Sequence, residues 1–284
     1  MVATLPHGAI LSRPRSIPEP RPGQLWSLSW DRTILGLVVL VRTYDSYFVG
    51  WPVTDRSLRP SSPCFAVAHP DSESELVCWP EAETGMSNAL LDSFLGEVLT
   101  ERQVRGIGEW VRRGDSVAGV EAYPHDDSDE ALDALGLVCE IAAAWSDLDS
   151  ADTQQAGVLN QATASAIDLD ARAIGQILDI SPGTAYEIAS GRRILRPEHA
   201  ALLAEARNVP VDDLWSVPSG PEYSLLRSPL VKADVLRKAD QLRRSEEVIR
   251  WDAWERSLLA ARQTAASSKK AVLERVRHAI ESLE

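Results

Sequence analysis

The chain has 284 residues, 44% of them hydrophobic and 25% charged, with a formal net charge of −13. This length predicts two or three compact units, and the composition excludes wholesale disorder. The longest apolar runs, at 35–41 and 141–145, are far shorter than the ~20 residues of a membrane helix. Residues 1–10 contain no basic segment leading into an apolar core. We therefore expect a cytoplasmic protein with no secretory signal and no membrane partner.

The three cysteines, Cys64, Cys78 and Cys139, are widely spaced. That spacing fits neither a disulfide framework nor a zinc site, so free thiols are expected. The five histidines are scattered, and no His-Glu-x-x-His motif or phosphate-binding loop occurs. The sequence therefore predicts no metal site and no cofactor.

The negative charge is concentrated in the N-terminal half. Residues 1–150 carry 11 Lys and Arg against 23 Asp and Glu, a net charge of −12. Residues 151–220 carry 5 against 9 (net −4), and residues 221–284 carry 13 against 10 (net +3). Any contact with phosphate groups must come from local arginines, because the chain as a whole produces no positive field.

The fold class predicted is α+β with several domains. Residues 1–22, which contain five prolines, are expected to be a disordered lead-in. Short β-like segments at 25–30, 33–43, 47–53, 64–68 and 76–79 then predict a small barrel, with Trp26, Trp30, Trp51 and Trp79 in its core. Residues 88–98 and 100–112 are expected to be helices that close this domain at 23–115, the second beginning with a Thr100–Gln103 capping box.

An acidic stretch, 125–133, runs into an Ala- and Leu-rich segment. Acidic residues stabilise the first turn of a helix, so we interpret the stretch as the solvated start of a linker helix over 126–150. A metal site is the alternative.

The pattern over 169–190 predicts two helices joined by a tight turn. Asp170 is expected to cap the first helix, 171–178, and Ser181 the second, with Pro182 at its favoured first position. Gly175 is small where the second helix must cross closely, and Gly191 is a suitable C-terminal residue. A further helix at 198–206 and a segment at 209–214 complete an all-α domain over 154–216. This arrangement is typical of helix-turn-helix proteins, which place the second helix in the DNA major groove.

Residues 156–215 resemble the Cro/CI-type (XRE) repressor family. The matching residues are Ile174-Gly175, Ile180-Ser181, Thr184, Ile188, Gly191-Arg192-Arg193, Leu203-Ala204 and Val209-Pro210-Val211-Asp212-Asp213-Leu214. The resemblance implies a five-helix domain with a first helix near 156–166. It also implies two groups of residues that contact double-stranded DNA. Pro182, Gly183, Tyr186 and Glu187 would face the bases, while Ser181, Thr184, Arg192, Arg193 and Arg196 would lie near phosphates.

The residues expected at the bases differ from those that usually recognise them. Arg, Lys, Asn and Gln are the common donors and acceptors at groove edges, whereas this helix presents Pro182, Gly183, Tyr186 and Glu187. Glu187 would either accept a hydrogen bond from a cytosine amino group or repel phosphate. A protein-interaction module without DNA binding is therefore a second interpretation of the same helices.

The N-terminal segment resembles the MazF/PemK toxin family, an SH3-like barrel that cuts single-stranded RNA. The resemblance spans residues 21–107 and includes Arg21-Pro22-Gly23-Gln24-Leu25-Trp26, Trp51-Pro52-Val53-Thr54 and residues 91–107. It implies Thr54 as a catalytic residue. The family's usual arginine is absent, which leaves Arg42 or Arg32 as the cation that a ribonuclease needs. We expect this barrel to sense or to bind a partner rather than to catalyse.

The C-terminal part follows a linker at 217–221, with a second break at Pro229. Residues 231–284 are strongly helical in composition, with a weak stretch at 263–268. Apolar stripes run along this region and predict packing surfaces, against either the body of the protein or a second subunit. The stripe residues are Val235, Ala239, Leu242, Trp251, Trp254, Leu258, Val272, Val276, Ile280 and Leu283.

The leading hypothesis is a non-enzymatic, DNA-binding transcriptional regulator. A homodimer is expected because one helix-turn-helix covers only half of a binding site, and a protein partner would bind the barrel or the C-terminal helices. One alternative is a toxin–antitoxin-related ribonuclease fused to a DNA-binding domain. The other is the non-catalytic interaction module.

Overall fold

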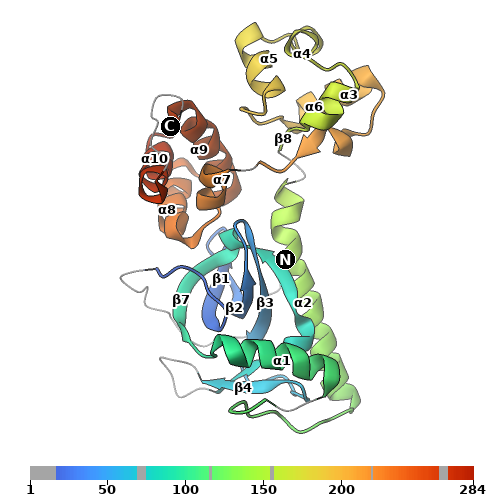
Figure 1. Cartoon of the computed structure of the whole chain (residues 1–284), viewed down its shortest axis with the longest axis vertical. Helices are drawn as coiled ribbons and strands as arrows, with labels where there is room; N and C mark the ends of the chain where they lie inside the picture. The colour runs from blue at the N-terminus through green and yellow to red at the C-terminus, as the bar shows by residue number, and fades with distance from the viewer. Residues whose placement is uncertain (1–16, 69–74, 115–116, 154–156, 219, 262–267) are drawn as a thin grey trace. The chain divides into compact units, whose positions relative to one another are not determined.

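A computed structural model describes residues 17–68, 75–114, 117–153, 157–218, 220–261 and 268–284. The predicted lead-in lies outside these residues up to position 16. The chain is α+β, as predicted, with a curled antiparallel sheet followed by helices (Figure 1). It divides into two compact units. The first comprises the described residues up to Leu148 together with 227–233, and the second comprises 149–226 and 234–284.

The sheet of the first unit is antiparallel and curls into a half-barrel. Its strands are β1 (Gln24–Trp30), β2 (Thr33–Thr43), β3 (Tyr47–Thr54), β4 (Phe65–Ala68), β5 (Glu75–Cys78), β6 (Thr84–Ser87) and β7 (Leu91–Glu97). The strand order is β4-β5-β3-β2-β1-β7, and β6 pairs with the other end of β3. All five predicted β segments are strands or lie beside one, and the four tryptophans expected in the core are buried.

Both faces of the sheet are covered, which explains why every residue of β1 is buried. Trp26 and its neighbours on one face pack with Ile141 and Trp145 of α2 (Asp129–Thr153). Leu25 and its neighbours on the other face pack with Ile107 and Trp110 of α1 (Glu101–Arg113). Successive strand side chains point to opposite faces, so one apolar run supplies both cores. Figure 1 shows the two helices on different sides of the sheet.

One predicted helix is wrong. Residues 88–98 form a short 3-10 turn, η2 (Asn88–Leu90), followed by strand β7, which pairs with β1. Leu91, Ser93 and Leu95 are buried while the residues between them are partly exposed, a two-residue period that belongs to a strand. The next helix, α1, forms as predicted, and both hydrogen bonds of its Thr100–Gln103 capping box are present.

The segment at the predicted second break, Pro229, is anchored in the first unit. It includes the 3-10 turn η4 (Pro229–Val231) and ends in Lys232, the first residue of α8 (Lys232–Leu242), which is 1% exposed. The Lys232 Nζ donates hydrogen bonds to the Ser29 carbonyl at 2.8 Å and the Ala89 carbonyl at 2.9 Å, and lies 5.7 Å from the Trp30 ring centroid. These contacts offset the cost of burying an ammonium group.

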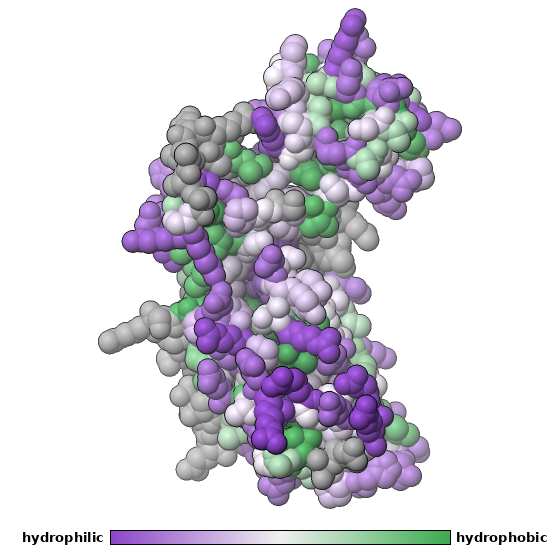
Figure 2. Space-filling view, in the orientation of Figure 1, coloured by the Kyte–Doolittle hydropathy of each residue, from purple (hydrophilic) through white to green (hydrophobic). Residues whose placement is uncertain are grey.

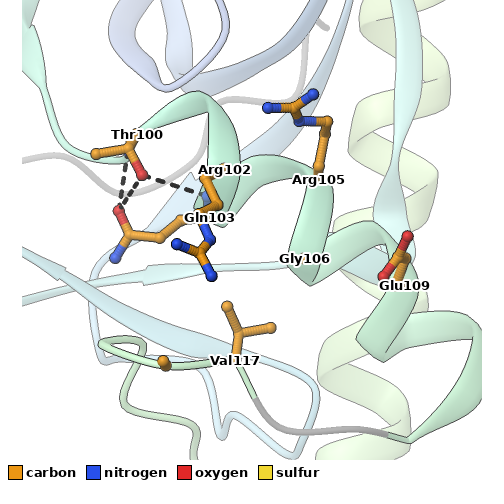
Figure 3. Close-up of a pocket in the computed structure, with 8 residues that line it drawn as sticks. Thr100, Arg102, Gln103, Arg105, Gly106, Glu109 and Val117 are labelled. Atoms are coloured by element: carbon orange, nitrogen blue, oxygen red, sulfur yellow. Dashed lines mark hydrogen bonds between the residues drawn. The ribbon is translucent and has the colours of Figure 1, made fainter.

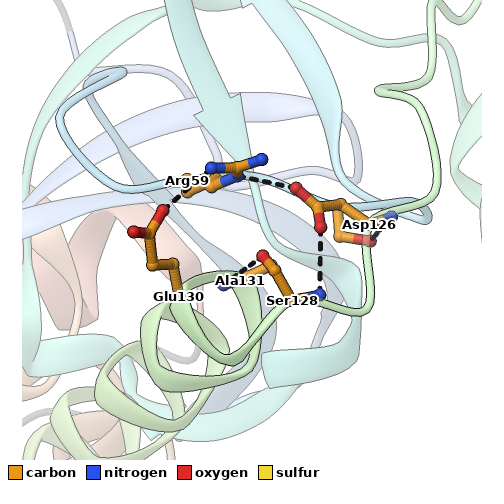
Figure 4. A network of polar contacts seen from close by, with 6 residues as sticks. Arg59, Asp126, Ser128, Glu130 and Ala131 are labelled. Atoms are coloured by element: carbon orange, nitrogen blue, oxygen red, sulfur yellow. Dashed lines mark hydrogen bonds and ion pairs between the residues drawn. The ribbon is translucent and has the colours of Figure 1, made fainter.

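The acidic stretch leads into the start of α2, and ion pairs with Arg59 hold it in place. Arg59 donates to Asp126 at 2.6 Å and to Glu130 at 2.8 Å (Figure 4). Hydrogen bonds from Ser128 and Arg59 lower the pKa of Asp126 to about 2. Among the described residues, no three His, Cys, Asp or Glu side chains gather where they could share a metal ion.

The first part of the second unit is a cluster of short helices: α3 (Gln161–Ala166), α4 (Ala171–Leu178), α5 (Pro182–Ala189), α6 (Pro197–Arg207) and the 3-10 turn η3 (Val211–Leu214). The strands β8 (Val158–Leu159) and β9 (Trp215–Ser216) pair with each other and join the ends of this cluster. Ile174, Ala185, Ile188, Leu203 and Leu214 form its core, each at most 1% exposed. The predicted boundaries of α4, α5 and α6 hold to within about two residues, the usual uncertainty of helix ends. The first helix, expected near 156–166, begins only at Gln161, because Val158 and Leu159 form a strand. The pairing of β8 with β9 also means that this part of the chain is not all-α, contrary to the prediction from the sequence.

The C-terminal helices are α7 (Pro221–Leu226), α8, α9 (Glu246–Ala261) and α10 (Lys269–Glu281). Most residues of the predicted apolar stripes are buried within the chain itself, including Trp251, Trp254 and Val276. The predicted weak stretch lies outside the described residues from 263 to 267, and a break at 243–245 was not predicted. Among the described residues, no helix has the length and apolar character needed to cross a lipid bilayer.

Gly23 fixes the point where three strands meet, and its substitution tests the sheet. Its φ is +86°, and a Cβ there would lie 2.0 Å from the carbonyl oxygen of Leu99. We expect Gly23→Ala to lower the free energy of unfolding of this unit by roughly 2–4 kcal/mol, because the backbone at Leu99 must move to make room for the added methyl group. Gly85→Ala is the control, since no atom lies within 4 Å of its Cβ position. Equal urea-denaturation midpoints for the two variants would contradict the prediction.

Candidate nucleic-acid interface

Helices α4 and α5 are joined by a tight turn whose caps form as the sequence predicts. The Asp170 side chain accepts a hydrogen bond from the Ala173 amide at 2.8 Å. The Ser181 Oγ accepts one from the Thr184 amide at 3.2 Å, and Pro182 begins the helix. Between them Asp179 has a φ of +52°, a left-handed conformation that ends α4. Side-chain oxygens thus satisfy backbone groups that the helix starts leave unpaired.

The two helices cross in close contact. A Cβ added to Gly175 of α4 would lie 3.4 Å from the Ala185 Cβ of α5. Ala185 and Ile188 are buried against the core of the helical cluster. The opposite side of α5 therefore faces outward.

The outward side of α5 presents small residues and one large ring. Pro182 and Gly183 are exposed, and a Cβ on Gly183 would meet only the Ser181 Oγ, at 3.9 Å. Tyr186, one turn later, is 55% exposed. The first turn of α5 can consequently come close to a surface, with the tyrosine ring beside it.

The segment after α5, residues 192–196, is called the arginine arm here. The Arg193 Nη1 lies 3.3 Å from the Glu187 carboxylate and 3.5 Å from the Thr184 Oγ1. The Arg192 guanidinium carbon lies 5.9 Å from the centroid of the Tyr186 ring. The arm is therefore attached to α5, and the charge of Glu187 is compensated by Arg193.

A carboxylate that the sequence did not indicate holds the other side of the arm. The amide of Ile194 donates a 2.8 Å hydrogen bond to Glu255 Oε1 of α9. Burial raises the pKa of Glu255, while this hydrogen bond and the charges of Arg193 and Arg196 act in the opposite direction. Arg196 is exposed and lies 4.0 Å from Glu198. Ile194 and Glu255 are 61 positions apart, and nothing in the sequence indicated this contact.

The structure links most of the residues predicted to contact DNA. Hydrogen bonds, an ion pair or a ring contact join Ser181, Thr184, Tyr186, Glu187, Arg192 and Arg193 into one surface. Its side chains supply two guanidinium groups, hydroxyls, a carboxylate and an aromatic ring. None of these side chains is arranged as a nucleophile beside a base.

The two residues predicted for ribonuclease chemistry are not brought together. Thr54 is 1% exposed; its Oγ1 donates to the Asp55 carbonyl and accepts from the Trp79 indole at 2.9 Å. Arg42 is exposed and pairs with Val49 near one end of the β2–β3 ladder. Thr54 lies at the other end, one residue after Val53, which pairs with Leu37. This register separates Thr54 and Arg42 by about 20 Å along the strands. Arg32 lies in the turn between β1 and β2, at a φ of +68°.

An aromatic surface stands at the other end of the β2–β3 hairpin. The rings of Tyr44 and Tyr47 stack with centroids 4.3 Å apart, although both side chains are more than 40% exposed. Asn88 Nδ2 donates to the Tyr44 carbonyl, which holds the turn in place. The strand register puts Arg42 and Val49 on the same face as the two rings. We call these four residues the hairpin face.

A groove runs beside α1 in the first unit. Its volume is about 740 Å³, and its lining includes Arg102, Arg105, Glu109 and Val117. Hydrophilic side chains gather over α1 on the face seen in Figure 2. Arg102 points towards Val117, whereas Arg105 points away from it (Figure 3). The charged groups do not converge on one point, so the groove has no defined site for a ligand.

In comparisons with protein-family models, curated proteins and solved structures, no match to this chain was found. The functional argument therefore depends on the geometry of the site.

Substitution of Gly175 tests whether the close crossing positions α5. We expect Gly175→Leu to cost about 1–3 kcal/mol by overpacking and to lower the protection of α5 amides against hydrogen exchange. Gly175→Ala should be nearly neutral, because its methyl group makes ordinary contact with Ala185. Gly136→Leu in α2 is the matched control, since no atom lies within 4 Å of that Cβ position. Unchanged α5 protection in Gly175→Leu would show that the crossing is not tight.

Proposed function

We propose that the chain is a DNA-binding transcriptional regulator of the XRE type. In this proposal, residues 154–216 form a helix-turn-helix domain in which α5 enters the major groove. Residues 23–115 form a small SH3-like barrel, and residues 231–284 form a C-terminal helical region. One observation carries the proposal: α5 presents an exposed first turn, and the arginine arm beside it is attached to the same helix.

The dimensions and shape of α5 suit a major groove, which is ~12 Å wide. Pro182 and Gly183 have little bulk, so the start of the helix can approach base edges closely. Tyr186 then offers an apolar ring and a hydroxyl group to the same base edges. Because Arg193 compensates Glu187, that carboxylate can accept from a cytosine amino group at a lower cost in repulsion from the phosphates.

Phosphate contacts in this proposal are local. The hydroxyls of Ser181 and Thr184 lie at the N-terminus of α5, and Arg192 and Arg196 are exposed beside it. Residues 151–220 nevertheless carry a net charge of −4. Binding should therefore depend on a few well-placed contacts, and a small number of phosphate contacts predicts a shallow dependence on salt.

The proposal includes a homodimer, because one helix-turn-helix covers half of a palindromic site. The apolar stripes of the C-terminal helices pack inside the chain, so the dimer must use another surface.

We further propose that the barrel binds a protein partner through the hairpin face. Tyrosine and arginine contribute most of the binding energy in many interfaces, and here two tyrosines and Arg42 lie together on a fixed turn. The ribonuclease alternative has no comparable support, because Thr54 is buried and its hydroxyl group makes two hydrogen bonds within the protein. We propose a cytoplasmic location, where such a regulator meets its DNA.

Selection from a random pool of DNA duplexes tests the function. We expect a palindromic sequence to be enriched both at low salt and at ~150 mM salt, because base contacts are less salt-sensitive than phosphate contacts. Enrichment of no sequence at either salt concentration would reject sequence-specific DNA binding and favour the interaction module.

Tyr186→Ala should weaken binding to the selected duplex by about tenfold or more, since one good base contact is worth ~1–3 kcal/mol. Fluorescence anisotropy would measure the dissociation constants. Tyr44→Ala is the matched control, because it removes an equally exposed tyrosine from the hairpin face. If both variants bind the duplex like the unchanged protein, Tyr186 does not face the bases.

A further inference from the structure

The arginine arm contains the elements of an anion site, and one anion already occupies it. The Ile194 amide points at Glu255 Oε1 over 2.8 Å. Arg193 and Arg196 belong to the same arm, and their charges favour the ionised form of the Glu255 carboxyl group. A backbone amide in a segment that carries arginines is a combination with which proteins bind phosphate oxygens.

Arg193 also connects this site to the outward side of α5. Its guanidinium contacts Glu187 and Thr184, while the next residue in the chain donates to Glu255. The carboxylate of α9 therefore lies against the same segment that would meet a DNA phosphate beside the groove. Two anions cannot occupy the space in front of one amide without strong repulsion.

We propose that the arginine arm is a phosphate-binding site which Glu255 occupies in the free protein, so that α9 competes with the DNA backbone. This inference rests on the proposed function and adds a regulatory contact to it. Release of Glu255 from Ile194, by movement of α9 or by neutralisation of the carboxyl group, frees the amide and removes a negative charge from the arm. The C-terminal helices thereby control DNA affinity without touching the bases.

The charges around Glu255 agree with this role. Arg193 and Arg196 attract it, and Asp252, one turn earlier on α9, repels it. Asp252 is itself paired with Arg244 at 3.0 Å. Burial raises the pKa of Glu255 above the ordinary value for a glutamate, so protonation begins at a higher pH. DNA affinity should consequently increase as the pH falls, and Glu255→Gln should remove most of that increase.

Glu255→Gln tests the competition, because it keeps the shape and the hydrogen-bond acceptor but removes the charge. We expect the dissociation constant for a duplex of arbitrary sequence at low salt to fall about three- to tenfold. The slope of log affinity against log salt concentration should also become steeper, by the amount that about one additional phosphate contact contributes. Glu274→Gln is the matched control. It makes the same charge change on α10 at an exposed side chain that has no ion pair among the described residues. Equal affinities for the two variants, or weaker binding by Glu255→Gln, would overturn the inference while leaving DNA binding intact.

Inorganic phosphate provides a readout that needs no DNA. In Glu255→Gln, added phosphate should produce a saturable shift of the Ile194 amide signal in an NMR spectrum. The shift should be smaller in the unchanged protein, and absent when Arg193→Ala is added. A phosphate-dependent shift without any duplex binding would reject the proposed function but retain the anion site. Equal shifts in Glu255→Gln and the unchanged protein would reject the competition by Glu255, and no shift in either protein would reject the anion site.

Discussion

The position of α5 depends on how closely it crosses α4. The contact is made by two small residues, Gly175 and Ala185, and a Cβ on Gly175 would lie 3.4 Å from the Ala185 Cβ. A side chain much larger than a methyl group at either position would tilt α5 away from the core, which Ala185 and Ile188 now cover. Because the buried side is fixed in this way, Pro182, Gly183 and Tyr186 are left on the outside. The proposed interface is thus a consequence of core packing.

The arginine arm adds charge to a surface that the rest of the chain would make unfavourable for DNA. The first 150 residues carry a net charge of −12, so no general attraction to a polyanion exists. Arg193 is held against α5 by Thr184 and Glu187, and Ile194 is held by Glu255. Because the arm is already held in position, it loses less conformational entropy when it binds DNA. Its hydrogen bond to the Glu255 carboxylate has the opposite effect, since that bond must be released before the arm can bind phosphate. These opposing effects make the arm a suitable point of control.

Local signals in the sequence predicted the helical cluster well. Asp170, Ser181 and Pro182 act within a few residues of their position, and the structure shows each where the pattern placed it. Strand β7 was mistaken for a helix, because Ala89, Leu90 and Leu91 form an apolar run without a clear period. Its identity depends on pairing with β1, more than 60 residues earlier.

Contacts between distant parts of the chain were not predictable. The burial of Lys232 beneath the carbonyls of Ser29 and Ala89 joins residues 203 and 143 positions apart. The bond from Ile194 to Glu255 and the separation of Thr54 from Arg42 likewise follow from topology and register. The residue types of the candidate site were therefore visible in the sequence, whereas the groups that hold or sequester them were not.

Site-specific photocrosslinking tests the central claim most directly. A photoreactive benzoylphenylalanine would replace Tyr186 in one sample and Tyr44 in another, and each would be irradiated with the selected duplex. The account predicts crosslinks from position 186 to bases of the half-site and none from position 44. Crosslinks to DNA from position 44 alone, or crosslinks from position 186 only to protein, would contradict the claim that α5 contacts the bases.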